Sequence, residues 1–555
     1  MRDILKFGFR YIGKFKAHYV VYLILCFFNS LIGIGLPLLL GNIINIITEA
    51  QSENLLLRRV IVFFSLSILQ QVITFITNHI YLKIQSASGY YANREVLGKI
   101  YNSSYLNILQ EDPALLNQKV NNDCNVVVIF CISLFRDVIT NTVSFFFIAA
   151  ILISQSYIIG GVLLILAALY GIIYLAFKKS IYYANYNVNQ GQSLFFAKLY
   201  SIVSNMKAVR NNGFQSLVFE QQDKVFFCFY KSLYKRLKIS NQFEFASNVT
   251  TLAAQMVLFV YGGQMVLKKK MSMGIFVILS NYFSNMIQTI NYYLNLGESY
   301  QNTKTSYDRV MQYDKLPQIS YGDGKIDEIQ NISLNEVSFA YPFQKDLFKV
   351  SIDFIKGKIY WLQGNNGTGK TTLTNILTGL FGHDYTGRIE INNIPIKSLA
   401  YSNIIKKQIS IVEQSPFLLS ETYKNNLLLK TVAADKEKEL NSLIEEFGLK
   451  HFFEKLPEGM DTVYNSLNDN ISGGERQKLA IIRLLLSDSE VWILDEPAAA
   501  LDKQSCKKLY NILEERKSEH IIILISHDTP PVFDEIINLA GYSPSVTDLK
   551  DLSIR

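Results

Sequence analysis

Apolar stretches free of charged side chains recur through the first half of the chain, and polar segments of unequal length separate them. A helix needs about 20 mostly apolar residues to cross a bilayer, and each stretch meets this length. Residues 138–177 are enough for two crossings, and the polar run "SQSYIIGG" in their middle marks the turn between them. The pattern predicts six membrane-spanning helices, at 19–41, 60–82, 130–153, 157–177, 245–267 and 274–297.

The connections between the predicted spans are alternately short and long. The second (83–125) and the fourth (178–244) are long and charged and keep a helical period, so we expect the helices to continue beyond the bilayer. The N-terminal segment before Tyr19 is basic, which places the N-terminus in the cytoplasm by the positive-inside rule. An even number of spans returns the C-terminus to the same side. The run Lys268–Lys270 falls in an outside turn, against the same tendency.

After Glu298 the pattern changes from long helices to alternating strand-like and helix-like segments, which is typical of an α/β domain. We therefore expect an α-helical transmembrane domain with long cytoplasmic helical extensions, followed by an α/β domain. The expected ranges are 1–318 for the first domain, 319–329 for a linker and 330–555 for the second domain.

The composition supports a membrane protein. Hydrophobic residues make up 49% of the 555 residues and charged residues only 18%, with a mean hydropathy of +0.16, which is unusual for a soluble protein of this size. The net charge of +7 is not gathered into one basic run, so we expect no nucleic-acid partner. The five cysteines lack C-x-x-C spacing, which predicts reduced thiols and no zinc site.

A phosphate-binding loop opens the chemistry of the second half. The segment "GNNGTGKTT" follows the apolar run "KIYWLQ" and precedes the helical pattern "TTLTNILTGL", which is the strand–loop–helix setting of the G-x-x-x-x-G-K-[ST] motif. Its glycines let backbone N–H groups surround a phosphate at a helix N-terminus. Lys370 is expected to reach the β- and γ-phosphates and Thr371 to hold Mg²⁺. The nucleotide-binding residues expected in this loop are Gly364, Asn365, Asn366, Gly367, Thr368, Gly369, Lys370, Thr371 and Thr372.

The apolar run "VWILDEP" is interpreted as a buried strand that ends in two carboxylates. Downstream of a phosphate loop, Asp495 is expected to bind the magnesium ion through water, and Glu496 is expected to polarise the attacking water. The two motifs together predict hydrolysis of a nucleoside triphosphate with Mg²⁺.

The order of the motifs then resembles one family. Tyr341 in "VSFAYP" and the phosphate loop are followed by Gln414 in "ISIVEQSPF", the segment "ISGGERQ" (471–477), "ILDEP", Asp502 at the end of "AALD" and His527 in "IIILISHD". Over essentially its whole length, the second half resembles the nucleotide-binding domain of ATP-binding cassette (ABC) proteins. With six predicted spans before it, the whole chain resembles a half-size ABC exporter.

The resemblance implies further roles for single residues. Tyr341 is expected to stack on the adenine, Gln414 to sense Mg²⁺ and the attacking water, and His527 to contact the γ-phosphate. The catalytic residues implied are Lys370, Gln414, Glu496 and His527. The metal-binding residues implied are Thr371, Gln414 and Asp495.

The segment "ISGGERQ" is a second glycine-rich stretch before a helical pattern, and in this family it faces the ATP held by the phosphate loop of the other subunit. The resemblance thus implies a dimer, and the full catalytic set favours a second copy of this chain over a different partner. The segment departs from the common pattern at Ile471 and Glu475 without losing a catalytic group. The residues implied to complete the site are Ser472, Gly473, Gly474, Glu475 and Asp502.

Polar side chains recur at helical spacing on the last two predicted spans. Such groups avoid lipid and face other helices or water, so they either hold helices together or line a translocation cavity, and the sequence leaves both interpretations open. On the third span, Arg136 and Asp137 are expected to form an ion pair or a loop anchor rather than a cargo site. The candidate cargo-cavity residues are Asn248, Thr251, Gln255, Asn281, Asn285, Gln288, Tyr292 and Asn295.

We expect ATP-driven export by alternating access across a bacterial cell membrane, with the α/β domain and both termini in the cytoplasm. Because the candidate lining has no acidic residue, a small peptide or peptide-like antibiotic is the expected cargo; a multidrug or lipid exporter or flippase is the alternative. An ATP-gated channel, or a sensor that moves no cargo, is an alternative of another class. In the cytoplasmic loops, 110–118 and 210–216 occupy the positions at which the family places its coupling helices.

Overall fold

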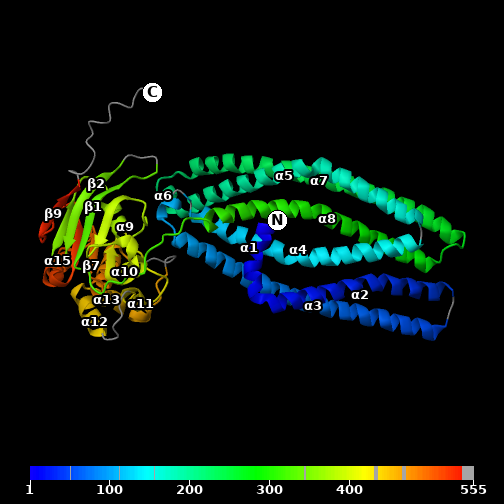
Figure 1. Ribbon diagram of the computed structural model, residues 1–555, viewed down its shortest axis with the longest axis horizontal. Helices are drawn as coiled ribbons and strands as arrows, with labels where there is room; N and C mark the ends of the chain where they lie inside the picture. Colours follow the sequence, from blue (N-terminus) through cyan, green and yellow to red (C-terminus); the bar gives the residue numbers. More distant parts are fainter. Residues whose placement is uncertain are drawn as a thin grey trace, which may run out of the picture. The chain divides into compact units, whose positions relative to one another are not determined.

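The chain folds into two units that we describe separately. The computed structural model describes residues 1–49, 52–109, 111, 113–155, 157–342, 346–429, 436–465 and 471–539. The first unit comprises Met1–Ile100 and Glu111–Leu316, and the second comprises Tyr101–Gln110 and Pro317–Arg555 (Figure 1). The first is helical and the second is α/β, which confirms the expected fold class.

The first unit consists of long helices joined by short turns, as Figure 1 shows. The N-terminal helix α1 is amphipathic and buries Ile4, Phe7 and Tyr11 against its neighbours, chiefly α4. Among the described residues, the helices of this unit are α1 (Arg2–Ile12), α2 (Lys16–Thr48), α3 (Glu53–Tyr101), α4 (Pro113–Gln155), α5 (Tyr157–Ser204), α6 (Met206–Asn211), α7 (Gln215–Leu267) and α8 (Met273–Asp314).

Four helical segments of the described chain are long and apolar enough to cross a membrane: Arg2–Thr48, Glu53–Tyr101, Lys119–Ser154 and Gln215–Leu267. The remaining predicted spans lie on α5 and α8. On α8 the hydropathy is lowered by the asparagine and glutamine side chains that the sequence singles out. All the long helices exceed the roughly 30 Å thickness of a bilayer core, so part of each must lie outside it.

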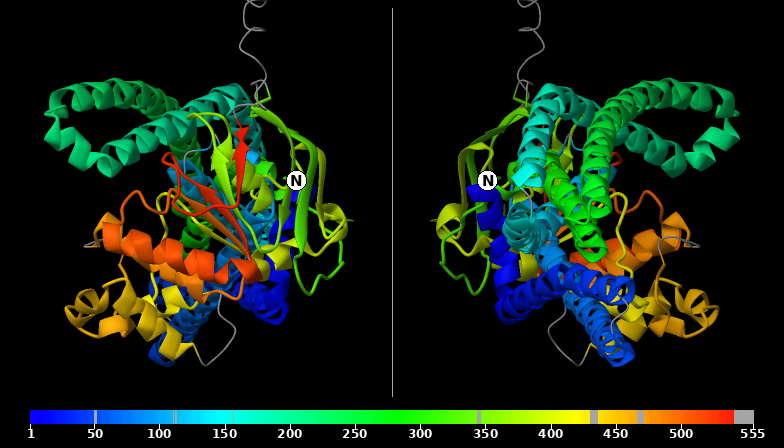
Figure 2. Two further views of the ribbon diagram at one scale, coloured as in Figure 1. Left: turned by 90° about the vertical axis from the view of Figure 1, so that its left-hand side faces the viewer. Right: turned by 90° about the vertical axis from the view of Figure 1, so that its right-hand side faces the viewer.

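A core of large side chains holds the first unit together. It joins α2, α4, α5, α7 and α8 and includes the buried Tyr170, Tyr282 and Phe283. The hydroxyl of Tyr282 donates to the carbonyl of Ile34 at 2.5 Å, and that of Tyr170 donates to the carbonyl of Ser247 at 3.0 Å. Helices α5 and α7 pack chiefly against each other, and Figure 2 shows this pair in teal and green running together.

The second unit contains two sheets. Strands β1 (Asn331–Phe339), β2 (Phe348–Ile355), β4 (Thr386–Ile391) and β5 (Ile394–Pro395) form an antiparallel sheet in the order β2-β1-β4-β5. The other sheet is parallel, in the order β6-β7-β8-β3-β9. Its strands are β3 (Ile359–Gln363), β6 (Ile409–Val412), β7 (Val491–Asp495), β8 (Ile521–Ile525) and β9 (Glu535–Asn538).

The parallel sheet is covered on both faces, which explains why its strands are almost entirely apolar. Ile493 and Ile523 belong to the core shared with the antiparallel sheet, whereas Trp492 and Leu494 point to the opposite core, under α14. The α-helices described in this unit are α9 (Lys370–Leu377), α10 (Tyr401–Gln408), α11 (Tyr423–Leu427), α12 (Glu437–Glu446), α13 (Lys450–Glu454), α14 (Gly473–Leu486) and α15 (Lys503–Arg516).

The short segment between α3 and α4 is part of the second unit. It contains the single 3₁₀ turn Tyr105–Asn107, whose Leu106 packs against the core of both sheets. The amide of Tyr105 donates to the carbonyl of Leu380 at 3.0 Å, and the hydroxyl of Ser104 donates to the carbonyl of Phe381 at 3.1 Å. The segment 110–118, which occupies the expected coupling-helix position, begins just after this turn; Gln110 and Asp112 lie outside the described residues.

Candidate functional site

The carboxyl ends of four parallel strands bring the predicted nucleotide site together. The phosphate loop follows β3, and Gln414 follows β6. Asp495 ends β7 and Glu496 comes directly after it, while His527 follows β8. Because parallel strands end at one edge of the sheet, these side chains meet there. They surround a cavity of about 510 Å³. Its predicted lining residues are Tyr341, Asn366, Gly367, Gly369, Lys370, Thr371, Thr372, Gln414, Asp495, Glu496 and His527.

The phosphate loop depends on two left-handed glycines. Gly367 and Gly369 have φ values of +84° and +91°, a region that residues with a Cβ rarely adopt. A Cβ on Gly369 would also lie 2.6 Å from the ring of Phe348. The loop turns directly into α9, whose first residue Lys370 is buried and donates from Nζ to the carbonyls of Gly364 (2.6 Å) and Asn365 (3.2 Å). The amino group is thereby held inside the curve of the loop.

Thr371 and Asp495 face each other at one side of the cavity. The hydroxyl of Thr371 donates to Oδ2 of Asp495 at 3.1 Å. Burial raises the pKa of Asp495, and the neighbouring Glu496 carboxylate adds to this, while the Thr371 hydrogen bond opposes it. A bound divalent cation would reverse this shift because it favours the charged carboxylate. A hydroxyl and a carboxylate are ligands that Mg²⁺ prefers, so this pair fits that ion.

Glu496 is held between two side chains in the same cavity. Gln414 donates from Nε2 to Oε2 of Glu496 at 2.8 Å, and Nε2 of His527 lies 3.0 Å from Oε1. Glu496 itself has a positive φ of +48°, an uncommon conformation for a non-glycine residue that often marks a functional position. The result is a carboxylate whose two oxygens are both fixed in place, with the pair directed into the cavity.

Tyr341 lies beside Thr372, at the end of the phosphate loop. Its hydroxyl is 3.2 Å from that of Thr372, and its ring packs edge-on against Phe339 and Phe381. Two further residues line the cavity, the apolar Leu347 and Ile525, and neither belongs to a motif that the sequence offers. No local signal distinguishes them from core residues, because only the tertiary fold turns their side chains to this edge.

The predicted signature residues form a separate structure in the same unit. Ser472 caps α14: its hydroxyl accepts from the Glu475 amide at 3.2 Å, and Glu475 accepts from the Ser472 amide at 2.9 Å. Asp502 caps α15 and pairs with Lys478 at 2.7 Å, and these partners hold its pKa below the usual range. Ser472, Gly473, Gly474, Glu475 and Asp502 do not line the cavity that contains the phosphate loop.

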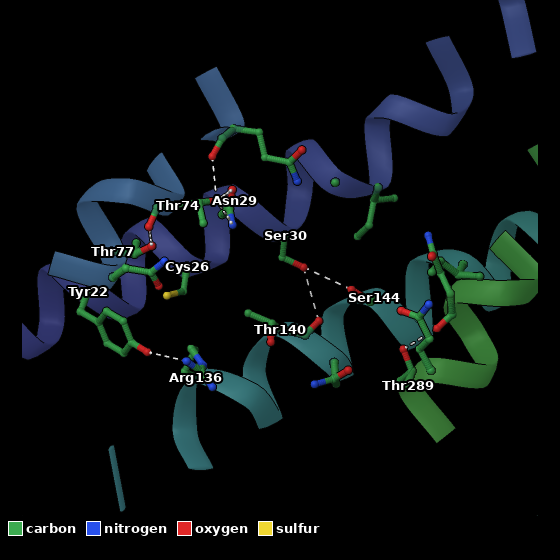
Figure 3. Close-up of a pocket in the computed structure, with 18 residues that line it drawn as sticks. Tyr22, Cys26, Asn29, Ser30, Thr74, Thr77, Arg136, Thr140, Ser144 and Thr289 are labelled. Atoms are coloured by element: carbon green, nitrogen blue, oxygen red, sulfur yellow. Dashed lines mark hydrogen bonds between the residues drawn. The ribbon is translucent and has the colours of Figure 1, made fainter. Parts of the chain in front are cut away.

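The first unit contains a polar cavity of about 520 Å³ between α2, α3, α4 and α8, shown in Figure 3. Most of its polar lining is uncharged, such as Ser30, whose hydroxyl lies 3.2 Å from that of Ser144. Arg136 is the single cationic lining residue; it pairs with Asp137 and donates to the Tyr22 hydroxyl at 3.1 Å. The expected ion pair is present, but Arg136 also lines the cavity, where the sequence predicted no part in a cargo site.

The structure distributes the candidate cargo residues over several environments. Asn285 and Gln288 line the cavity of Figure 3, and Asn295 lines a smaller one beside Tyr174. Thr251 bonds to the hydroxyl of Tyr170, so it joins α7 to α5. The others are elsewhere: Asn248 and Asn281 are exposed, Gln255 is half-buried, and the half-buried Tyr292 has no hydrogen-bond partner for its hydroxyl among the described residues.

Two family matches divide the chain in the same order as the folds. Residues 19–290 match the family described as ABC transporter transmembrane region, and residues 347–499 match the family described as ABC transporter. A solved structure described as a bacterial Atm1-family ABC exporter with ATP bound superposes with a TM-score of 0.82 at 15% identity, covering 95% of each chain. At this identity the likeness concerns the fold.

Curated relatives match parts of the sequence. The ATP-dependent lipid A-core flippase of Haemophilus influenzae (strain 86-028NP) is 29% identical over 283 residues, which is 50% of this chain and 48% of that protein. The chain thus spans about half the length of such relatives. A serine protease/ABC transporter B family protein of Dictyostelium discoideum is 24% identical over 528 residues, 91% of this chain and 29% of that protein.

Proposed function

The chain belongs to the ABC transporter family, and on that premise we propose that it is an ATP-driven exporter of an amphipathic, lipid-like molecule. The proposal rests on one observation: Lys370, Asp495 and Glu496 meet in one cavity of the second unit, the ATP-binding cassette. Because a membrane-spanning helical unit is part of the same chain, the free energy of ATP hydrolysis can drive transport across the membrane. Both termini and the cassette would lie on the cytoplasmic side of a bacterial cell membrane.

The residues present fit ATP and Mg²⁺. Loop amides between Gly364 and Thr372 would hold the β- and γ-phosphates, and Lys370 would exchange its bonds to loop carbonyls for phosphate oxygens. Thr371 would ligate Mg²⁺ directly and Asp495 through water, and the ion would neutralise charge on the transferred phosphoryl group. Tyr341, beside the loop, is placed to stack on the adenine.

Glu496 would orient and polarise the attacking water. Gln414 and His527 fix its two oxygens at 2.8 Å and 3.0 Å, so the carboxylate is presented in one orientation without reorganisation. Gln414 would also contact Mg²⁺, and His527 the γ-phosphate. These roles require a water molecule between Glu496 and the γ-phosphate.

We further propose that the working form is a dimer of this chain. The signature residues do not line the cavity of their own chain, so a second copy has to supply them to the ATP. The α5–α7 pair also carries exposed aromatic side chains in its predicted cytoplasmic part, including Phe227 (58% exposed) and Tyr234 (61% exposed). Exposed apolar surface of this kind marks an interaction site, and a second copy is the partner that fits.

The cargo that we propose is lipid-like. Relatives described as lipid A-core flippases favour a lipid-like cargo over the peptide expected from the sequence. The cavity of Figure 3 supports an amphipathic molecule, because its lining combines hydroxyl and amide groups with Cys26, Ile34 and Ile148. A peptide-like cargo remains the second candidate, since amide groups of a peptide would satisfy the same side chains. ATP binding would shift the helices between two states of different cargo affinity.

Reconstitution into proteoliposomes tests the proposal. We expect ATP-dependent transfer of a fluorescent lipid between leaflets that is lost in Glu496→Gln; transfer of a labelled peptide instead would favour the second candidate. ATP hydrolysis at a normal rate with no movement of either probe would contradict export and favour a gating or sensing role.

A further inference from the structure

A separate polar cavity of about 280 Å³ lies in the first unit between α4, α5, α7 and α8. Its lining residues lie outside the predicted spans: Val126 is four positions before residue 130, and Arg236 is nine positions before residue 245. At a rise of 1.5 Å per residue these positions are about 6 and 14 Å beyond the spans. The cavity would therefore lie at the cytoplasmic surface of the membrane, apart from the ATP site and from the cavity of Figure 3.

Positive charge predominates in this cavity. Lys119, Arg236 and Arg309 line it, against the single carboxylate of Asp123. Asp123 is buried and accepts from Nε and an Nη of Arg309, both at 2.7 Å. Lys119 pairs with Glu111 at 2.9 Å. Two of the three cations are therefore neutralised by the protein itself.

Arg236 is the cation that is left. It is half-buried, and no carboxylate among the described residues forms an ion pair with it. The amide side chains of Asn189 and Gln192 line the same space and add hydrogen-bond donors. A half-buried guanidinium without a carboxylate, surrounded by further donors, is an arrangement that favours an anion with several acceptor oxygens.

We propose that this cavity binds a phosphate-bearing anion, with Arg236 as its principal partner. Phosphate matches the planar pair of N–H groups on a guanidinium and leaves oxygens for the neighbouring amides. The volume of about 280 Å³ lies just below the roughly 300 Å³ at which drug-sized sites begin, so it suits a head group or a small organic phosphate. The chemistry is shared by the head group of an anionic lipid in the inner leaflet and by a free cytoplasmic phosphate.

The two sources are distinguished with the full chain in nanodiscs, with a non-hydrolysable ATP analogue at saturation so that the phosphate loop is occupied. In one arm the nanodiscs contain phosphatidylcholine alone, and glycerol phosphate is titrated by calorimetry. In the other arm they contain an equimolar mixture of phosphatidylcholine and phosphatidylglycerol, and the phosphatidylglycerol retained by the protein is counted by native mass spectrometry.

In whichever arm the wild type binds its ligand, we expect Arg236→Gln to weaken binding about tenfold, as for loss of a charge-assisted hydrogen bond. Arg236→Lys should weaken it less. The matched control is Lys235→Gln, an exposed neighbour that does not line the cavity; it should bind as the wild type does. Equal binding by Arg236→Gln and the wild type in both arms would overturn the proposal. An equal loss in Lys235→Gln would overturn it too, because the attraction would then be non-specific. Neither result depends on whether the chain exports a cargo.

Discussion

Nε2 of His527 lies 3.0 Å from Oε1 of Glu496, although the two residues follow different strands of the parallel sheet. Gln414, from a third strand, holds the other oxygen of the same carboxylate at 2.8 Å. The relationship matters because Glu496 is the one side chain of the cavity whose two oxygens are both fixed by neighbours that are themselves proposed to sense the nucleotide.

Replacing Glu496 by glutamine should abolish turnover while ATP still binds. The amide cannot accept a proton from water, and loss of a general base typically lowers the rate about 10²–10⁴-fold. Phosphate release and retention of labelled ATP measure the two effects, and the variant should accumulate as a closed dimer. The control is Glu413→Gln, at the exposed residue that precedes Gln414 and does not line the cavity. A wild-type rate of ATP hydrolysis in Glu496→Gln would show that Glu496 does not activate the attacking water.

Replacing Gly369 by alanine should abolish ATP binding. Gly369 and Gly357 share a φ of +91°, but only the Cβ at Gly369 meets a neighbour, the Phe348 ring at 2.6 Å. Both variants carry the backbone strain, on the order of 1 kcal/mol, so Gly357→Ala is the control for stability alone. Thermal unfolding with and without ATP separates the effects: ATP should still raise the melting temperature of Gly357→Ala. A similar ATP-induced rise in Gly369→Ala would contradict the prediction.

Mixing two inactive variants should restore activity if the sites are shared between subunits. A dimer of one Lys370→Ala chain and one Ser472→Ala chain keeps one phosphate loop and one signature intact, and these face each other only across the interface. We expect co-expressed variants to hydrolyse ATP, whereas each variant alone does not. If phosphate loop and signature of one chain formed a site together, the mixture would stay inactive, because every chain carries one defect.

Acidification should destabilise the cassette through His520. Its ring stacks on Trp492 at 3.8 Å, and burial lowers its pKa from 6.5 to about 4. Above pH 6.5 His520 is neutral in both the folded and the unfolded chain, so it adds no pH dependence to the free energy of unfolding. Between pH 6.5 and about 4 the unfolded chain takes up the proton and the folded one does not, so stability falls as the pH falls. Because the ring is partly exposed, the free energy of unfolding should fall by less than roughly 1.4 kcal/mol per pH unit.

Tryptophan fluorescence can follow this transition, because Trp361 and Trp492 are the two tryptophans of the chain and both lie in the cassette. His520→Gln should flatten the dependence of the melting temperature on pH over that interval. An unchanged slope in the variant would assign the effect to other groups.

Replacing Asn285 by alanine should weaken cargo recognition. Asn285 lines the cavity of Figure 3, whereas Asn281, one turn earlier on α8, is exposed and bonds within its own helix at 2.9 Å. Loss of a neutral hydrogen bond corresponds to about a fivefold change in affinity. The cargo concentration that half-maximally stimulates ATPase activity measures it. Asn281→Ala should match the wild type; an equal shift in both variants would mean that the cavity does not select the cargo.

The sequence by itself determined the two folds and the local chemistry of the ATP site. Uncharged stretches and helical period identify the long helices, because a bilayer accepts few other patterns. The phosphate loop and the two carboxylates after β7 were identified because each motif is contiguous: its glycines, lysine and acids act through the backbone on which they lie.

Tertiary structure decided which distant residues meet. Strand order places Gln414 and His527 on either side of Glu496, and it adds Leu347 and Ile525, which no local pattern distinguishes from core residues. The same holds in the first unit. Periodicity grouped eight polar residues, but a period fixes only the face of one helix, and Asn285 reaches a cavity while Thr251 joins two helices because of the helices packed against each. The sequence specifies the side chains and their local geometry, and the packing of separate elements decides which of them share a site.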